Sequence, residues 1–85
     1  MIHAVKCRSN YFKALQSGQK SFEVRKNDRD YKVGDLLGIN EIDNGGNYTG
    51  KSLVCKINYI LDDFEGLQKD YIVMSVSSIY PDTEF

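Results

Sequence analysis

Hydrophobic and polar residues alternate in several short stretches of the chain, and this period of two predicts a fold rich in β-strands. The clearest alternation runs over residues 51–60. Its apolar positions are expected on one face of a strand, and they are Leu53, Cys55, Ile57 and Tyr59. Other strands are predicted over 2–7, 21–25 and 36–42. The nearly continuous apolar run over 71–76 predicts a central strand covered on both faces.

One short helix is predicted near the amino terminus, over residues 11–17. Residues that can cap its start, Arg8-Ser9-Asn10, precede it, and Gly18 follows it, where helices commonly end in a left-handed residue. Tyr11 and Phe12 both stand at helical spacing from Leu15. We therefore expect the helix to lay this face on the sheet.

The connections carry turn residues. Residues 26–31 predict a polar surface loop, and Asp43-Asn44-Gly45-Gly46 predicts a hairpin because Asn-Gly accepts positive dihedral angles. The acid-rich segment 61–67 predicts a loop or a single helical turn, and residues 81–85 are expected to form a frayed end. The elements together predict an α+β domain over residues 1–80. In it, about five to six strands form a curved β-barrel with one short N-terminal helix, because closure hides sheet edges.

Length and composition restrict the class of protein. The chain has 85 residues, 41% hydrophobic and 27% charged, which fits one small folded domain. It contains no apolar run long enough for a membrane span and no export signal, so we expect it in the cytoplasm. Cys7 and Cys55 lack CxxC spacing, and the single histidine, His3, stands beside neither. We therefore expect no metal or cofactor, and we favour small buried thiols over a disulfide or a catalytic cysteine.

The charges are unevenly distributed along the chain. Residues 1–35 carry eight Lys or Arg against four acids, a balance of +4, and residues 36–85 carry three against eight, a balance of −5. Such an asymmetry can give a nearly neutral protein a local positive face that contacts phosphate. The alternative is that folding mixes the two halves and cancels the field.

The segment GQKSFEVR, residues 18–25, holds the candidate site. Phe22 and Val24 alternate with Glu23 and Arg25, which predicts a strand with one buried and one solvated face, and Glu23 and Arg25 on the same face. Guanidinium and carboxylate groups together can hold an anion or the edge of a base. Lys20 reaches this site only if the chain turns between Gly18 and Ser21. The alternative is a solvated pair without function.

The order strand, short helix ending in glycine, GxKxxExR and a VGD-led strand resembles the ASCH domain of the PUA-like superfamily. The likeness covers most of the chain, in GQKSFEVRKNDRDYKVGD, NYILDDF and GLQKDYIVMSV. It implies a small β-barrel with a cleft beside the helix that binds RNA or a modified nucleoside. By position, the implied site residues are Lys20, Glu23 and Arg25, with Gly18 permitting close approach.

Some relatives in that superfamily are amidohydrolases that act on an acylated cytidine with a lysine, a threonine nucleophile and a distant glutamate. Here Glu23 occupies the position of the threonine and cannot act as a hydroxyl nucleophile. An enzyme of this kind would instead use Glu23 as a general base on water. Lys20 or Arg25 would then stabilise the oxyanion.

The sequence is therefore compatible with three functions. The favoured one is an RNA- or nucleotide-binding module whose ligand is held by Lys20, Glu23 and Arg25. Lys20 and Arg25, with Arg29 nearby, would contact phosphate or carbonyl groups, and Glu23 would accept from a base amino group. Tyr11 or Tyr31 would stack on a base. Single-stranded or looped RNA fits better than duplex DNA, because no recognition helix of useful length is predicted. The alternatives are a nucleoside-directed hydrolase that uses Lys20 and Glu23, and a protein-interaction module that uses the acidic segment 62–65.

Overall fold

The computed structural model describes residues 1–79, so the expected tail at 81–85 lies outside the described residues. Within residues 1–79 the chain forms one helix, α1 (Ser9–Ser17), and five strands. The strands are β1 (Ile2–Arg8), β2 (Phe22–Lys26), β3 (Leu36–Ile42), β4 (Tyr48–Leu61) and β5 (Tyr71–Ser78). They form one sheet in the order β1-β3-β4-β5-β2. β1 runs parallel to β3, and the other neighbouring pairs are antiparallel.

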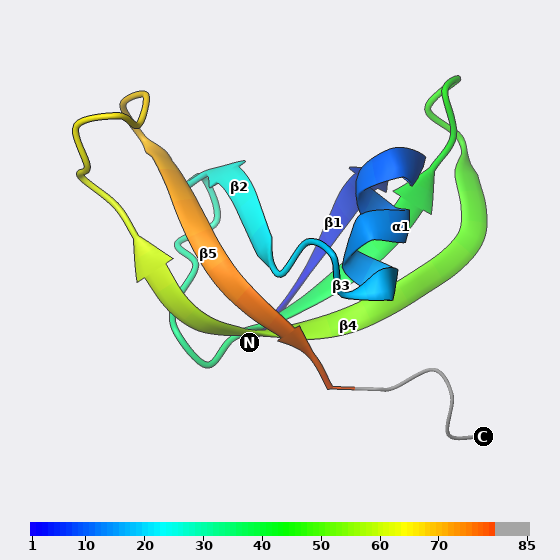
Figure 1. Cartoon of the computed structure of the whole chain (residues 1–85), viewed down its shortest axis with the longest axis horizontal. Coiled ribbons are helices and arrows are strands. Elements are labelled where there is room, and N and C mark those ends of the chain that lie inside the picture. Colours follow the sequence, from blue (N-terminus) through cyan, green and yellow to red (C-terminus); the bar gives the residue numbers. More distant parts are fainter. Residues whose placement is uncertain (80–85) are drawn as a thin grey trace.

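The sheet curls into a half-barrel, which confirms the predicted small α+β fold with a curved sheet. Figure 1 shows a trough with β1 and α1 on one wall and β5 and β2 on the other. β1 and β2 are the two edge strands of the sheet and do not pair with each other. Closure by a continuous hydrogen-bonded ladder is therefore incomplete, and an opening remains between the two edges.

The core fills the inside of the trough. Inward residues of the strands are buried together with Phe12 and Leu15 of α1. The helix therefore packs on the sheet as expected, and it ends at Gly18, whose φ of 84° is left-handed. Tyr11 does not share the buried face, because its side chain is 48% exposed. No side chain caps the start of the helix, since the Ser9 hydroxyl donates instead to the carbonyl of Ile42.

A β-bulge makes the pattern of buried residues in β4 differ from the predicted alternation. Cys55 and Ile57 face the core as expected, but the register of β4 against β5 shifts between Ile57 and Tyr59. The extra residue reverses the alternation, so Tyr59 turns outward with 63% of its side chain exposed, while Ile60 packs on the core.

The two faces of β2 are the reverse of the prediction. Phe22 and Val24 are about half exposed and lie at the rim of an open cleft, whereas Glu23 is only 4% exposed. The inward position of Glu23 is possible because its carboxylate finds cationic partners inside the trough. β5 likewise has only one fully buried face, since its outer residues are half-buried. The expectation of a strand covered on both faces is therefore wrong.

The predicted hairpin joins β3 to β4. Asp43 closes the turn by accepting the amide of Gly46 on its carbonyl, and its side chain accepts the amides of Gly45 and Asn47. Gly46 adopts φ 82°, the left-handed conformation that the glycine supplies. Among residues 1–79 no helix has the length and apolarity to cross a membrane.

Asp35 ties the loop before β3 to β1. Its carboxylate lies 2.8 Å from Nε2 of the buried His3 and 3.2 Å from the backbone nitrogen of Lys32, and the ring of Tyr31 packs edge-on against His3. The hydrogen bond with His3, followed by that from the Lys32 amide, lowers the pKa of Asp35 below its usual value.

We predict that Asp35→Asn destabilises the protein at neutral pH more than at acid pH. A carboxylate with a lowered pKa contributes stability above its ordinary pKa, and this contribution is lost as the pH falls through the folded-state pKa. Urea unfolding of both proteins at pH 7 and near pH 3 measures the difference. A difference in unfolding free energy that stays constant over this range would contradict the assignment.

Candidate functional site

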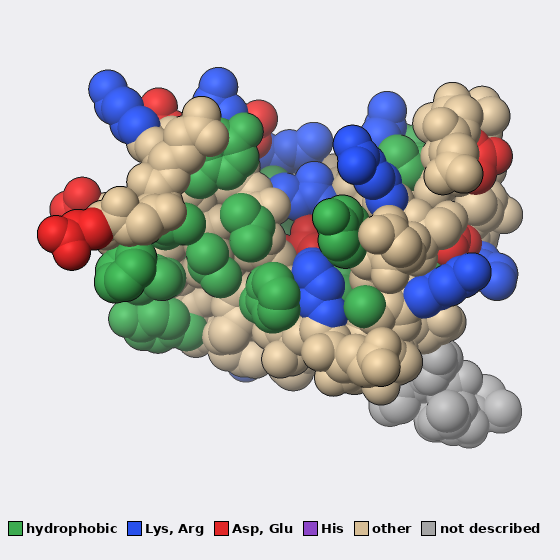
Figure 2. Space-filling model, turned by 45° about the horizontal axis from the view of Figure 1, so that its top comes forward, with side chains coloured by type: hydrophobic (Ala, Val, Ile, Leu, Met, Phe, Trp, Pro, Cys, Tyr) green, Lys and Arg blue, Asp and Glu red, His purple; other side chains and the backbone are tan. Residues whose placement is uncertain are grey.

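A cleft of about 520 Å³ opens between the β1 and α1 wall and the edge strand β2. Figure 2 shows cationic side chains gathered around a carboxylate in this hollow. The lining residues come from β1, α1, β2 and the link before β2. They are Lys6, Cys7, Arg8, Tyr11, Lys20, Phe22, Glu23, Val24 and Arg25.

Glu23 is the centre of the polar network. Its Oε1 accepts from Lys20 Nζ at 2.8 Å, and its Oε2 accepts from Arg25 Nε at 2.9 Å. Glu23 and Arg25 share a face of β2, as the alternation predicted. Lys20 joins them because the chain turns before β2 begins, with the Lys20 amide donating to the carbonyl of Ala14. The cation on each oxygen offsets the cost of burying this carboxylate, and the two charge-assisted hydrogen bonds hold both cations in place.

Arginine side chains connect the two edges of the sheet. Arg25 donates to the Lys6 carbonyl of β1 at 2.6 Å. Arg29 donates to the carbonyl of Ala4, two residues earlier on the same strand. Both carbonyls belong to the edge strand β1, which has a sheet partner on one side only. The guanidinium groups therefore take the place of the missing strand pairing at the opening of the half-barrel.

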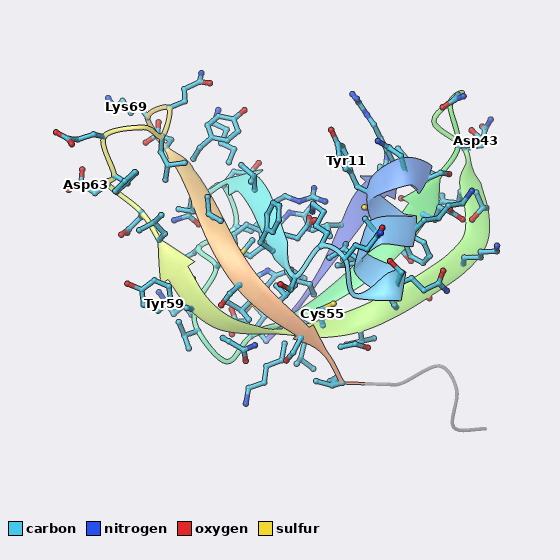
Figure 3. The ribbon with its side chains drawn as sticks, viewed as in Figure 1. Tyr11, Asp43, Cys55, Tyr59, Asp63 and Lys69 are labelled. Atoms are coloured by element: carbon cyan, nitrogen blue, oxygen red, sulfur yellow. The ribbon has the colours of Figure 1, made fainter. Side chains whose placement is uncertain are left out.

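Two exposed aromatic rings flank Lys20. Its Nζ lies 5.5 Å from the ring centroid of Tyr11 and 4.8 Å from that of Phe22, which is 44% exposed. Figure 3 shows Tyr11 rising from α1 at the rim of the trough. Tyr31 is buried against His3 and cannot stack on a ligand, so that expectation is wrong.

The structure brings most of the predicted residues together. Tyr11, Lys20, Glu23 and Arg25 line one cleft, whereas Gly18 lines a neighbouring groove and Arg29 lies outside the cleft lining. Five further lining residues were not predicted from the sequence: Lys6, Cys7, Arg8, Phe22 and Val24. The alternation along β1 does indicate that Lys6 and Arg8 are solvent-exposed. The sequence does not show, however, that β1 faces β2 across an opening.

The charge asymmetry survives in the fold. Four cationic residues of the cleft stand against the single carboxylate of Glu23. Acids of the second half line a different pocket, of about 580 Å³, at the tip between β4 and β5, where Figure 3 labels Asp63. The cleft is thus a local positive region on a chain with a formal net charge of −1.

Both thiols are free and buried, as predicted. Burial, followed by the charge of Glu23, raises the pKa of Cys7, and the same two causes raise the pKa of Cys55 to about 11. Thiols with raised pKa values stay protonated at neutral pH and are poor nucleophiles. Residues 1–79 contain no cluster of three or more His, Cys, Asp or Glu side chains that could hold a metal ion.

The fold and cleft define a small half-barrel protein with a cationic opening between its sheet edges. Residues 2–76 match the family described as a domain of unknown function, DUF3850, and the chain belongs to this family.

One relative is an uncharacterised 12.9 kDa protein encoded in the GpA 3′ region of Escherichia phage P2. It is 36% identical over 73 residues, which cover 86% of this chain and 65% of the phage protein. The crystal structure of the hypothetical protein PH0355 is similar in fold, with a TM-score of 0.60 and 16% identity. The match covers 93% of this chain and all of that one.

We predict that Glu23→Gln lowers the free energy of unfolding by roughly 2 kcal/mol, because a neutral amide accepts from only one of the two cations and turns its own donors toward the other. Glu65→Gln, the same chemical change on an exposed residue, serves as control and is expected to change stability by less than about 0.5 kcal/mol. Urea denaturation measures both variants. Equal stability of the two variants would show that the Glu23 network does not hold the cleft together.

Proposed function

We propose that this protein is a binding module for single-stranded RNA or nucleotides and that the ligand occupies the cleft between β1 and β2. The observation that carries the proposal is the combination of two exposed aromatic rings, Tyr11 and Phe22, with the fixed cation of Lys20 between them. Rings of this kind stack on bases, and cations beside them contact phosphate.

The remaining lining residues suit the same ligand. Lys6 and Arg8 extend the positive charge along the β1 rim of the cleft, where a phosphate backbone would lie. Glu23 holds the cations of Lys20 and Arg25 in place, one on each carboxylate oxygen. Because the Glu23 side chain is almost fully buried, we assign it this holding role rather than a contact with a base amino group. The resemblance to ASCH domains supports the same class of ligand. We therefore also propose that the family is an ASCH-like branch of the PUA-like superfamily and that the protein works in the cytoplasm.

The network of Glu23 favours binding over hydrolysis. Both carboxylate oxygens accept from cations, and the side chain is almost fully buried, which leaves little access for a water that a general base would activate. Turnover of acylated nucleosides by the wild-type protein, abolished in Glu23→Gln, would replace the binding module with the hydrolase.

We predict that Tyr11→Ala weakens binding of a fluorescently labelled single-stranded RNA about tenfold, since one base stack is worth roughly 1–3 kcal/mol. Tyr59→Ala is the control, because Tyr59 is also an exposed tyrosine but lies on the outside of the opposite wall. Fluorescence anisotropy titrations give both dissociation constants. Equal affinities of the two variants would remove Tyr11 from the binding site, and no binding by the wild-type protein would end the proposal.

We predict that Arg8→Ala flattens the salt dependence of RNA binding. Loss of one phosphate contact to a single strand reduces the slope of log K against log salt by about 0.7. Lys69→Ala, at the acidic tip, removes the same charge far from the cleft and should leave the slope unchanged. Repeating the anisotropy titration at several salt concentrations gives the slopes. A slope that Arg8→Ala does not change would show that the β1 rim does not contact phosphate.

A further inference from the structure

A second groove, of about 320 Å³, continues the cleft on the other side of Lys20. It lies between the end of α1 and the end of β5, and Lys20 is the residue that its lining shares with the cleft. The two hollows are therefore neighbours at Lys20. A ligand longer than one nucleotide that occupies both hollows would run past Lys20.

The groove has a different chemical character from the cleft. Val76 contributes an apolar side chain, Ser17 and Ser21 contribute hydroxyls, and no Lys or Arg other than Lys20 belongs to the lining. The carbonyls at the end of α1 turn toward this end of the molecule and give it slight negative polarity. These properties suit an uncharged sugar and base and disfavour a phosphate inside the groove.

Lys20 has capacity left for the linking phosphate. An ammonium group carries three donors, and Lys20 uses one on the Phe22 carbonyl and one on Glu23. Among residues 1–79 the third donor makes no hydrogen bond, and we assign it to an anionic oxygen of the ligand. Because Glu23 fixes the ammonium group, little side-chain entropy is lost when the phosphate binds.

We propose that the preferred ligand is a dinucleotide unit of single-stranded RNA that crosses Lys20. One nucleoside lies against Tyr11 in the cleft, the linking phosphate contacts Lys20, and the next nucleoside fills the groove beside Ser21. This inference rests on the proposed function and adds the minimum length of the ligand and the path of its chain.

The test compares the affinities of cytidine 5′-monophosphate, 5′-phosphorylated cytidylyl-cytidine, and the same dinucleotide with an abasic second position, at constant ionic strength. The complete dinucleotide is expected to bind about tenfold more tightly than the monophosphate, because its second base makes additional contacts in the groove. The abasic dinucleotide should lose most of this gain, since it keeps only the phosphate contact.

Variants separate the groove from the cleft. Gln16→Trp places a bulky side chain at the groove from the exposed surface of α1 and should reduce the dinucleotide affinity to that of the monophosphate, with the monophosphate affinity unchanged. Lys13→Trp is the matched control on the same helix outside the groove lining, and it should preserve the gain.

The outcomes distinguish this inference from the function on which it rests. Equal binding of monophosphate and dinucleotide by the wild-type protein would overturn the dinucleotide path and leave the nucleotide-binding cleft intact. A gain that survives in Gln16→Trp would also overturn it, because the second nucleoside would then lie elsewhere. Failure of the wild-type protein to bind any of the three ligands would overturn both proposals.

Discussion

The ion pairs of Glu23 with Lys20 and Arg25 are the interaction on which the opening of this half-barrel depends. The carboxylate is buried on the edge strand β2, and Arg25 reaches from it to the Lys6 carbonyl of the opposite edge strand. A five-stranded sheet of this curvature leaves two unpaired edges, and unpaired edges are prone to association with other chains. Arg25 and Arg29 donate to two carbonyls of the β1 edge, so the protein keeps a cleft where a closed barrel would have backbone pairing.

Most of the fold could be predicted from the sequence because its signals are local. Gly18 ends the helix and Gly46 completes the hairpin, each in the left-handed conformation expected of the turn residues. The strands follow from alternation. The position of Tyr59 could not be predicted, because the bulge after Ile57 depends on the register against β5. The burial of Glu23 in place of Phe22 and Val24 could not be predicted either. Phe22 and Val24 have the side chains of core residues, and the cationic partners of Glu23 become known only from the structure.

The site was predictable as a segment but not as a cleft. Glu23 and Arg25 share a face because they are two residues apart on a strand, and this spacing is visible in the sequence. The sequence does not show that Lys6 and Arg8 lie beside Glu23 and Arg25, because this depends on β1 and β2 being the two edges of one curled sheet. Long-range sheet order is set by the packing of the whole chain. The different environments of Tyr11 and Tyr31 likewise follow from tertiary contacts that neither residue type reveals.

Titration of the isotope-labelled protein with cytidine 5′-monophosphate, followed by NMR, tests the central claim that the cleft around the Glu23 network is the ligand site. The account predicts that the Nε–H resonance of Arg25 and the backbone amides over 20–25 shift together with one saturating dissociation curve. The amides of the acidic tip, 62–70, should stay unchanged. Shifts confined to the acidic tip or to the outer face of β5, with the Arg25 resonance unmoved, would contradict it.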